Sequence, residues 1–170
     1  MNYRRTVTDE QALIKLTALC AKGEHCKEEM RTKMQRWGIE PERQEKILDY
    51  LVKERYIDEK RYARFFINDK IKYNKWGCKK VEQALYMKRI PREIYEPILS
   101  EIEDESYEEI LLPLLKNKVK TVKASSDYEK RGKLIRFALQ RGFSMDQALH
   151  CLELLKVGSK NSHELNYSII

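Results

Sequence analysis

The sequence contains little glycine and proline and no long run of hydrophobic residues. Only 6 of its 170 residues are glycine and 4 are proline, whereas 36% are charged. Apolar residues occur singly or in pairs among lysine, glutamate, arginine and glutamine, and runs of β-branched residues are almost absent. Because sheets are built from β-branched and aromatic runs, this composition favours helices. We therefore expect an all-α protein.

Sequence signals for membranes and secretion are also missing. No apolar run approaches the roughly 20 residues that a membrane-spanning helix needs. The first residues, MNYRRTVTDEQ, include two arginines with no apolar segment after them, so we expect no signal peptide. The four cysteines, Cys20, Cys26, Cys78 and Cys151, lack the close pairing of a secreted disulfide scaffold. We expect a soluble, cytoplasmic protein with reduced thiols and no membrane partner.

No arrangement of residues predicts catalysis. The sequence lacks a glycine-rich phosphate loop and the turn that presents a nucleophilic serine. In CAKGEHC, Cys20, His25 and Cys26 are close together, but the two-residue spacing of paired zinc ligands and a fourth ligand are missing. Cys151 follows His150 directly, yet it also falls in an apolar column of an internal repeat. We therefore expect no enzyme activity, no cofactor and no metal.

Charge is unevenly distributed along a chain whose net charge is +7. Residues 60–92 include 11 basic and 2 acidic residues, and residues 116–141 include 9 basic and 2 acidic residues. Between these segments, residues 93–109 include 8 acidic and no basic residues. Two basic segments that flank an acidic one indicate a polyanionic partner and leave room for a second, protein partner. Solvated helix faces are the alternative interpretation of each basic segment.

An internal repeat runs through the sequence. Three segments align without gaps: MRTKMQRWGIEPERQEKILDYL from Met30, VEQALYMKRIPREIYEPILSEI from Val81, and LIRFALQRGFSMDQALHCLELL from Leu134. Their starts are 51 and then 53 residues apart. Six columns are apolar in all three copies, namely Met30/Val81/Leu134, Met34/Leu85/Ala138, Ile39/Ile90/Phe143, Ile47/Ile98/Cys151, Leu48/Leu99/Leu152 and Leu51/Ile102/Leu155. Chance rarely keeps six such columns in register, so we infer a repeat.

Each copy carries the signals of two helices joined by a tight turn. Gly38 and Gly142 mark the turn, because glycine tolerates the left-handed backbone that ends many helices. Signals for a new helix follow, namely Pro41, Pro91, and Ser144 with Gln147 as a capping box. Each copy is therefore expected to be a helix, a turn and a second helix.

A further helix precedes each pair, beginning at Thr8, at Asp58 and near Ser106. Because a unit of about 50 residues buries little surface alone, we expect neighbouring units to pack end to end into an elongated, curved body. A C-terminal tail without periodicity is expected to be flexible. The predicted divisions are three three-helix repeats at residues 1–57, 58–104 and 105–157, and the tail at residues 158–170.

The helix expected after Asp58 has two distinct faces. Tyr62, Ala63, Phe66 and Ile67 recur at helical spacing, which predicts a core stripe rather than a platform for stacking bases. The opposite side is basic, and the third repeat contains a similar basic helix. Basic faces bind phosphates without selecting a sequence. The candidate residues for binding DNA or a partner are Arg61, Arg64, Lys72, Lys75, Lys79, Lys80, Lys130, Arg131, Lys133, Arg136 and Arg141.

The segment YIDEKRYARFFINDKIKYNKWGCKKVEQALYMKRIPREIYEPIL, from Tyr56 to Leu99, resembles the central part of the RecX regulatory proteins. The QRGF turn at residues 140–143 and the three-helix repeats fit as well, so the resemblance covers residues 9–155. Arg89 departs from the pattern, because such proteins usually carry glycine before this turn; an arginine there could alter the turn or add a surface charge. The matching residues are Asp58, Tyr62, Ala63, Gly77, Lys80, Val81, Leu85 and Ile90.

The resemblance implies a non-enzymatic bacterial modulator of the RecA recombinase, acting in recombination and DNA repair. Such proteins bind along the groove of the RecA–DNA filament and suppress RecA ATP hydrolysis and strand exchange. The implied partners are the RecA filament and DNA without strong sequence preference. Single-stranded DNA is the first candidate, and double-stranded DNA is the second. Two points stay open at this stage: which basic residues contact DNA and which contact protein, and whether the filament is capped at its end or bound along its length.

Two other functions stay open from the residues alone. Two helices joined by a tight turn also form the helix-turn-helix motif of DNA-binding transcriptional regulators. However, the second helices, PERQEKILDYL and PREIYEPILSEI, are rich in acids, which disfavours entry into the major groove. The other alternative is a scaffold that binds only protein, which would have no affinity for DNA at low salt.

Overall fold

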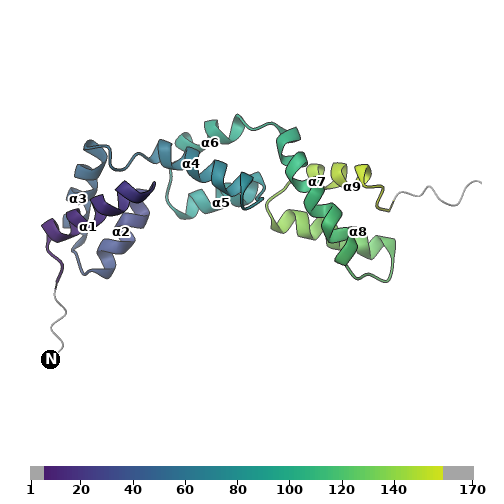
Figure 1. The fold of residues 1–170 in the computed structure, drawn as a ribbon, viewed down its shortest axis with the longest axis horizontal. Coiled ribbons are helices and arrows are strands. Elements are labelled where there is room, and N and C mark those ends of the chain that lie inside the picture. The colour runs from purple at the N-terminus through teal and green to yellow at the C-terminus, as the bar shows by residue number, and fades with distance from the viewer. Residues whose placement is uncertain (1–5, 159–170) are drawn as a thin grey trace, which may run out of the picture. The chain divides into compact units, whose positions relative to one another are not determined.

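The computed structural model describes residues 6–158, and this part of the chain contains nine α-helices and no strand. Figure 1 shows the helices, which follow one another in groups of three along the chain. The expected all-α fold of tandem three-helix groups is confirmed, whereas an elongated, curved body stays a prediction. The helices are α1 (Asp9–Lys22), α2 (Lys27–Arg36), α3 (Pro41–Lys53), α4 (Glu59–Lys72), α5 (Cys78–Met87), α6 (Arg92–Ser100), α7 (Asp104–Thr121), α8 (Asp127–Gln140) and α9 (Met145–Leu154).

The helix starts follow the sequence signals closely. The Thr8 hydroxyl accepts a hydrogen bond from the Gln11 amide at 3.2 Å, and the Gln11 side chain accepts one from the Thr8 amide at 3.1 Å. Ser144 caps α9 in the same reciprocal way. These bonds satisfy amides that the first turn of a helix leaves without partners. The helix expected to begin near Ser106 is α7, which begins two residues earlier, at Asp104.

The apolar columns of the repeat form the core of each helix group. Met30, Val81 and Leu134 of the first column are all 0% exposed. The second column, Met34, Leu85 and Ala138, is equally buried. The last column is less uniform: Leu51 is buried, whereas Ile102 and Leu155 are only half-buried. The pattern that identified the repeat therefore also identified most of what packs inside it.

The tight turn after the second helix of each group has one geometry in all three copies. Gly38 and Gly142 adopt positive φ angles of 75° and 95°, and Arg89 adopts a φ of 55° at the equivalent position. In every copy, the amide of the following residue, Ile39, Ile90 or Phe143, donates to the carbonyl five residues earlier at 3.1 Å. The arginine therefore leaves the turn unaltered and takes a left-handed backbone that favours glycine.

The described residues form two compact units that do not follow the predicted repeat boundaries. One unit takes in the residues up to Asp69 together with Glu82–Glu101, and the other takes in Lys70–Val81 together with the residues from Ile102 onward. The second helix group is thus shared between the units, since the split passes through α4 and α5. The boundaries at residues 57, 104 and 157 stay a prediction. Residues 159–170 of the predicted flexible tail lie outside the described residues.

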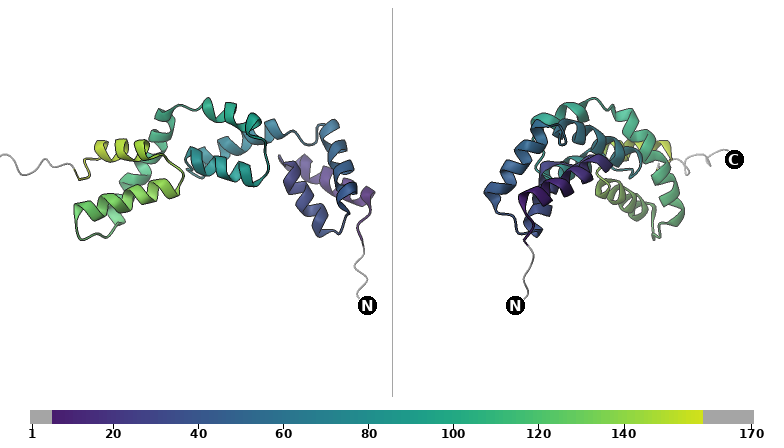
Figure 2. Two further views of the ribbon diagram at one scale, coloured as in Figure 1. Left: turned by 180° about the vertical axis from the view of Figure 1, so that it is seen from behind. Right: turned by 60° about the vertical axis from the view of Figure 1, so that its left-hand side comes forward.

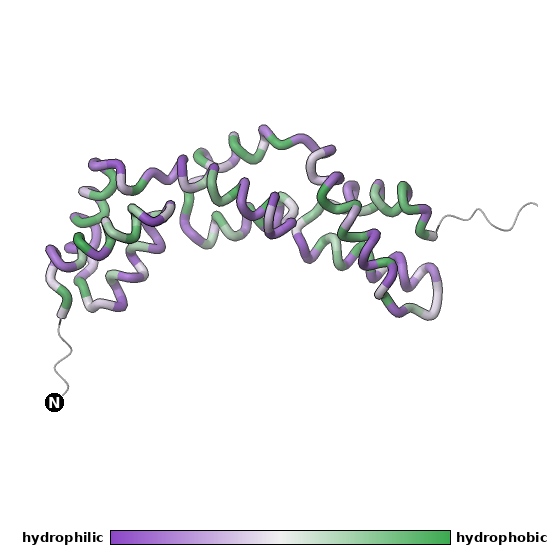
Figure 3. The backbone as a smooth tube through the Cα atoms, viewed as in Figure 1, coloured by the Kyte–Doolittle hydropathy of each residue, from purple (hydrophilic) through white to green (hydrophobic). Residues whose placement is uncertain are grey.

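Within each unit the helices contact one another directly. α1 and α2 both pack on α3, while α7, α8 and α9 pack pairwise. Both views of Figure 2 show α7, α8 and α9 side by side. Along each helix, hydrophobic and hydrophilic residues alternate every few positions (Figure 3), as expected for helices with one buried face. Among residues 6–158, no helix is long and apolar enough to cross a membrane.

Candidate partner interface

The apolar face of α4 packs as the sequence predicts. Tyr62, Ala63, Phe66 and Ile67 are between 0% and 7% exposed, and the rings of Tyr62 and Phe66 stack with their centroids 5.8 Å apart. Asp58 begins the helix, since its carboxylate accepts a hydrogen bond from the Arg61 amide at 3.0 Å. These rings belong to the core, so they are not a surface on which bases could stack.

The opposite face of α4 is exposed and basic, but two of its arginines already have partners. Arg61 pairs with Glu24 at 2.5 Å, and Arg64 pairs with Glu101 at 3.0 Å. Ion pairs at exposed positions contribute only about 0–1 kcal/mol, so a polyanion can compete for both arginines. Lys72 is exposed further along the helix and makes no ion pair among the described residues.

The candidate lysines after α4 divide into exposed and packed residues. Lys75 and Lys79 are exposed, and neither side chain forms an ion pair within the described part of the chain. Lys80 instead lies over the ring of Trp76, with its Nζ 4.5 Å from the ring centroid. This cation–π contact leaves Lys80 less available to a partner than Lys75 and Lys79.

Several candidate residues in the third helix group already make hydrogen bonds or ion pairs within the protein. Arg131 donates to the carbonyl of Val157 at 3.0 Å, and Arg141 donates to the carbonyl of Asn74 at 2.9 Å. Lys133 pairs with Glu129 at 2.8 Å. The two remaining candidates, Lys130 and Arg136, make no such contact among residues 6–158. Some predicted binding residues therefore already contact other residues of the chain, and their role in binding a partner stays a prediction.

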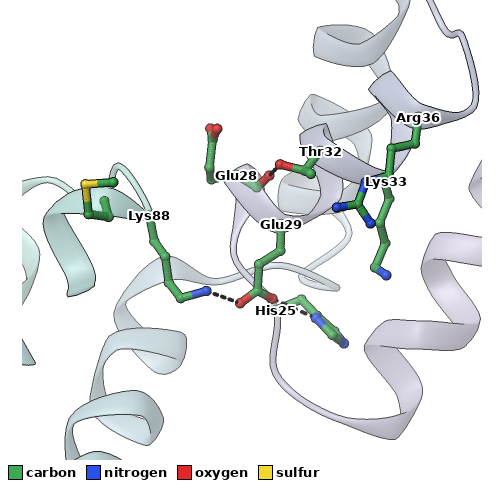
Figure 4. Close-up of a pocket in the computed structure, with 8 residues that line it drawn as sticks. His25, Glu28, Glu29, Thr32, Lys33, Arg36 and Lys88 are labelled. Atoms are coloured by element: carbon green, nitrogen blue, oxygen red, sulfur yellow. Dashed lines mark hydrogen bonds and ion pairs between the residues drawn. The ribbon is translucent and has the colours of Figure 1, made fainter.

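One polar cluster was not predicted from the sequence. Glu29, in the first turn of α2, accepts hydrogen bonds from Lys88 Nζ at 2.9 Å and from the Tyr62 hydroxyl at 2.8 Å. Its other carboxylate oxygen lies 2.8 Å from Nδ1 of His25, which must carry the proton because an ionised carboxylate only accepts. Figure 4 shows Lys88 and His25 reaching Glu29 from different elements. We call these four residues the Glu29 cluster.

The electrostatics of the Glu29 cluster favour an ionised carboxylate. Burial alone would raise the pKa of Glu29, but the hydrogen bonds from Lys88, Tyr62 and His25 outweigh it and lower the pKa below its usual range. Burial and the adjacent Glu29 charge raise the pKa of Tyr62 strongly, so this phenol stays protonated and keeps donating. The cluster therefore joins the first helix group to α4 and to the turn after α5 through charge. Histidine and glutamate four residues apart were the only local signal for it.

The residues considered for zinc have other contacts. His25 belongs to the Glu29 cluster, and Cys26 is fully buried at the start of α2. Burial also raises the pKa of the Cys26 thiol, which opposes the thiolate form that binds zinc. No group of three or more histidine, cysteine, aspartate or glutamate side chains suited to a metal occurs among the described residues.

Two protein-family models match the chain. A model described as the second three-helix domain of RecX matches residues 58–96, and a model described as the third three-helix domain matches residues 105–152. Each match lies within the part of the chain where α4–α6 or α7–α9 are found. Together the two models cover about half of the chain.

The individual proteins to which the chain is similar are also RecX proteins. A regulatory protein RecX from Clostridium botulinum is 33% identical over 120 residues, which are 69% of this chain and 56% of that protein. Another from Vibrio parahaemolyticus is 26% identical over 147 residues, 86% of this chain and 91% of that protein. The crystal structure of RecX from Lactobacillus salivarius has a TM-score of 0.75 at 20% identity, covering 87% of this chain and 96% of that chain, which concerns the fold alone. The chain thus spans little more than half the length of the clostridial relative.

Proposed function

Because the chain belongs to the RecX family of regulatory proteins, we propose that it is a non-enzymatic regulator of the RecA recombinase. In this proposal it binds in the groove of the RecA–DNA filament in the cytoplasm and lowers RecA ATP hydrolysis and strand exchange. The effect on the cell is a restraint on homologous recombination and on the repair and SOS responses that depend on the filament.

The observation that carries the proposal is the exposed basic face of α4 and the residues after it, within a chain of this family. Its cations Arg61, Arg64, Lys72, Lys75 and Lys79 face solvent, while the other side of the helix packs inward. Exposed cations of this kind bind a phosphate backbone without reading its bases. A filament that contains any DNA sequence requires that kind of contact.

A sequence-specific transcriptional regulator is less well supported. In such a protein the second helix after the turn enters the major groove. The second helices here, α3 and α6, carry exposed acids such as Glu42, Glu45, Glu93 and Glu96. These carboxylates would be repelled by the DNA phosphates, so α3 and α6 are poor recognition helices.

RecA ATP hydrolysis on single-stranded DNA is the direct test. Adding this protein at or below the RecA concentration is expected to slow hydrolysis and to shorten the lifetime of the filament. A parallel binding measurement at two salt concentrations checks for the steep salt dependence of phosphate contacts. Unchanged hydrolysis and an unchanged filament lifetime would refute the proposal. A footprint on one duplex sequence that survives competitor DNA would favour the transcriptional regulator instead.

A further inference from the structure

The corner where α5 turns into α6 combines exposed apolar side chains with a hollow. Tyr86 and Met87 are 72% and 71% exposed, although both are large and apolar. They border a hollow of about 720 Å³, whose wall includes the buried Tyr95. At its rim the side chains of Arg89 and Arg92 are 73% and 67% exposed. We call Tyr86, Met87, Arg89, Arg92 and Tyr95 the α5–α6 corner.

The internal repeat shows that the fold does not require these side chains. All three copies make the same turn, and two of them make it with glycine at the Arg89 position. An arginine there costs conformational energy, because a left-handed backbone is unfavourable for residues with a Cβ atom. The equivalents of Tyr86, Met87 and Arg89 are Gln35, Arg36 and Gly38 in the first copy, and Leu139, Gln140 and Gly142 in the third.

A clustered set of apolar and basic side chains that packing does not explain is typical of a binding surface. The hollow has the size of a small ligand site and is therefore large enough for the side chain of a partner. Methionine and tyrosine suit this role, since both present apolar surface that adapts to a neighbour.

The charges around the corner favour a protein partner over nucleic acid. α6 carries exposed acids at Glu93 and Glu96, which would repel a phosphate backbone. The two rim arginines can still bind single carboxylates. Arg89 lies 3.7 Å from its nearest carboxylate, Glu28, which already pairs with Arg31 at 2.7 Å. The guanidinium of Arg89 is therefore the more available one for a carboxylate of a partner.

We infer that the α5–α6 corner binds a protein segment in which an apolar side chain is flanked by a carboxylate, and that this segment belongs to a recombinase subunit. The inference rests on the proposed function and deepens it, because it separates the protein-binding surface from the DNA-binding one. In this arrangement Tyr86 and Met87 receive the apolar side chain, and Arg89 receives the carboxylate. The basic face of α4 contacts DNA.

The test compares binding to RecA filaments on single-stranded DNA with binding to the same DNA alone. The double variant Tyr86→Ala with Met87→Ala is expected to lose about tenfold or more in filament affinity, as truncated hot-spot side chains do, and to keep its affinity for naked DNA. Arg89→Gly is expected to lose filament affinity too, although it restores the residue that the turn prefers and so should melt no lower than the parent chain. A variant that binds the filament more weakly but is no less stable than the parent chain shows that unfolding does not cause the loss of affinity.

Tyr128→Ala is the matched control, since Tyr128 is 90% exposed and lies away from the corner in the sequence. It should leave both affinities unchanged. If the corner variants bind the filament as tightly as the parent chain does, the inference is wrong and the proposed function stands. If they lose affinity for naked DNA to the same extent, the corner binds nucleic acid and the inference is also wrong. If the parent chain does not bind the filament at all, both the inference and the proposed function fail.

Discussion

The backbone of Gly77 lies directly against the backbone of Gly142. The Gly77 amide donates to the Arg141 carbonyl at 2.7 Å, and the Lys79 amide donates to the Gly142 carbonyl at 3.1 Å. A methyl group added at Gly77 would lie 2.3 Å from the carbonyl carbon of Gly142, and one added at Gly142 would lie 2.5 Å from Lys80. The turn between α4 and α5 is thus joined to the turn between α8 and α9 by backbone contact.

Substituting Gly77 by alanine should destabilise the chain strongly. The added methyl group would meet backbone atoms, which cannot rotate away as a side-chain end can. Overpacking of this kind typically costs about 1–3 kcal/mol. Urea unfolding followed by circular dichroism measures the change. Gly132→Ala, within α8, is the control, because nothing lies within 4 Å of the added methyl group and alanine favours helices; it should be neutral or stabilising. Equal midpoints for Gly77→Ala and the parent chain would contradict the prediction.

The equivalent positions in the preceding pair of repeats hold side chains instead of close backbone contact. By the repeat offsets, Cys26 corresponds to Gly77 and Arg89 corresponds to Gly142. Here the first and second helix groups are linked by the ion pair of Glu29 with Lys88 at 2.9 Å, while Arg89 lies 3.7 Å from Glu28. Beside them is a hollow of about 510 Å³ that His25 also lines (Figure 4). One junction is therefore fixed by backbone, and the other depends on charge.

The charged junction should make stability depend on pH through Glu29. The folded state lowers the pKa of Glu29 below the unfolded value of 4.5, so ionisation of this group stabilises the fold. That contribution is complete above pH 4.5, declines as the pH falls towards the folded pKa, and is absent below it. Glu29→Gln should cost about 1.5–3 kcal/mol at pH 7, the usual range for hydrogen bonds to a charged group.

Unfolding midpoints of Glu29→Gln and the parent chain between pH 7 and pH 3 check this prediction. The difference between the two proteins should be largest at pH 7 and should shrink as the pH falls below 4.5. Glu45→Gln serves as the control, since Glu45 is more exposed and pairs with Arg31 at the surface; its effect should stay below about 1 kcal/mol. A Glu29→Gln difference that is the same at both ends of the pH range would show that the carboxylate charge is not what stabilises the junction.

Restoring glycine at position 89 should stabilise the chain. Arg89 has a φ of 55°, and a left-handed backbone costs a residue with a Cβ atom about 1–2 kcal/mol. Part of the gain is lost because glycine makes the unfolded chain more flexible, so Arg89→Gly is expected to gain up to about 1 kcal/mol. Gly38→Ala, at the same turn position with a φ of 75°, should lose a similar amount. Thermal melting measures both changes, and a lower melting temperature for Arg89→Gly would refute the argument.

How much of this could be predicted from the sequence depends on the range of each interaction. Thr8 with Gln11 and Ser144 with Gln147 act over three residues, so their patterns predict the caps directly. The repeat columns predict the cores because they recur in each copy. The approach of Gly77 to Gly142 depends on how separate repeats meet. A single glycine does not reveal which backbone it will touch.

In the candidate interface, too, the sequence predicts short-range features but not long-range contacts. Helical spacing correctly separates the buried stripe of Tyr62 and Phe66 from the basic stripe of Arg61 and Arg64. It does not predict that Arg141 donates to backbone carbonyls, because those acceptors lie 66 and 67 residues away. Charge in a sequence identifies candidates for binding, whereas only the structure shows which of them already have a partner.

Under the proposed function, the lysines without ion pairs should carry the salt dependence of DNA binding. Lys72 and Lys75 are exposed and have no carboxylate partner among the described residues, so phosphate contacts displace no internal ion pair. Each phosphate contact contributes about 0.7 to the slope of log affinity against log salt for single-stranded DNA. Replacing both by glutamine should therefore lower the slope by up to about 1.4 and weaken binding at low salt. Fluorescence anisotropy with an oligonucleotide at several salt concentrations measures both quantities.

The matched control for these lysines is Lys46→Gln with Lys53→Gln, which removes the same charge from exposed positions on helix α3, where Glu42, Glu45 and Asp49 are also exposed. If the effect came from net charge alone, the two double variants would change the slope equally. We expect the α3 variant to retain the slope of the parent chain, because its lysines lie among carboxylates that keep phosphates away. Under the proposed function, inhibition of RecA ATP hydrolysis should follow the DNA affinity of each variant. Full inhibition by the Lys72 and Lys75 variant, despite a reduced slope, would exclude this stripe from the filament interface.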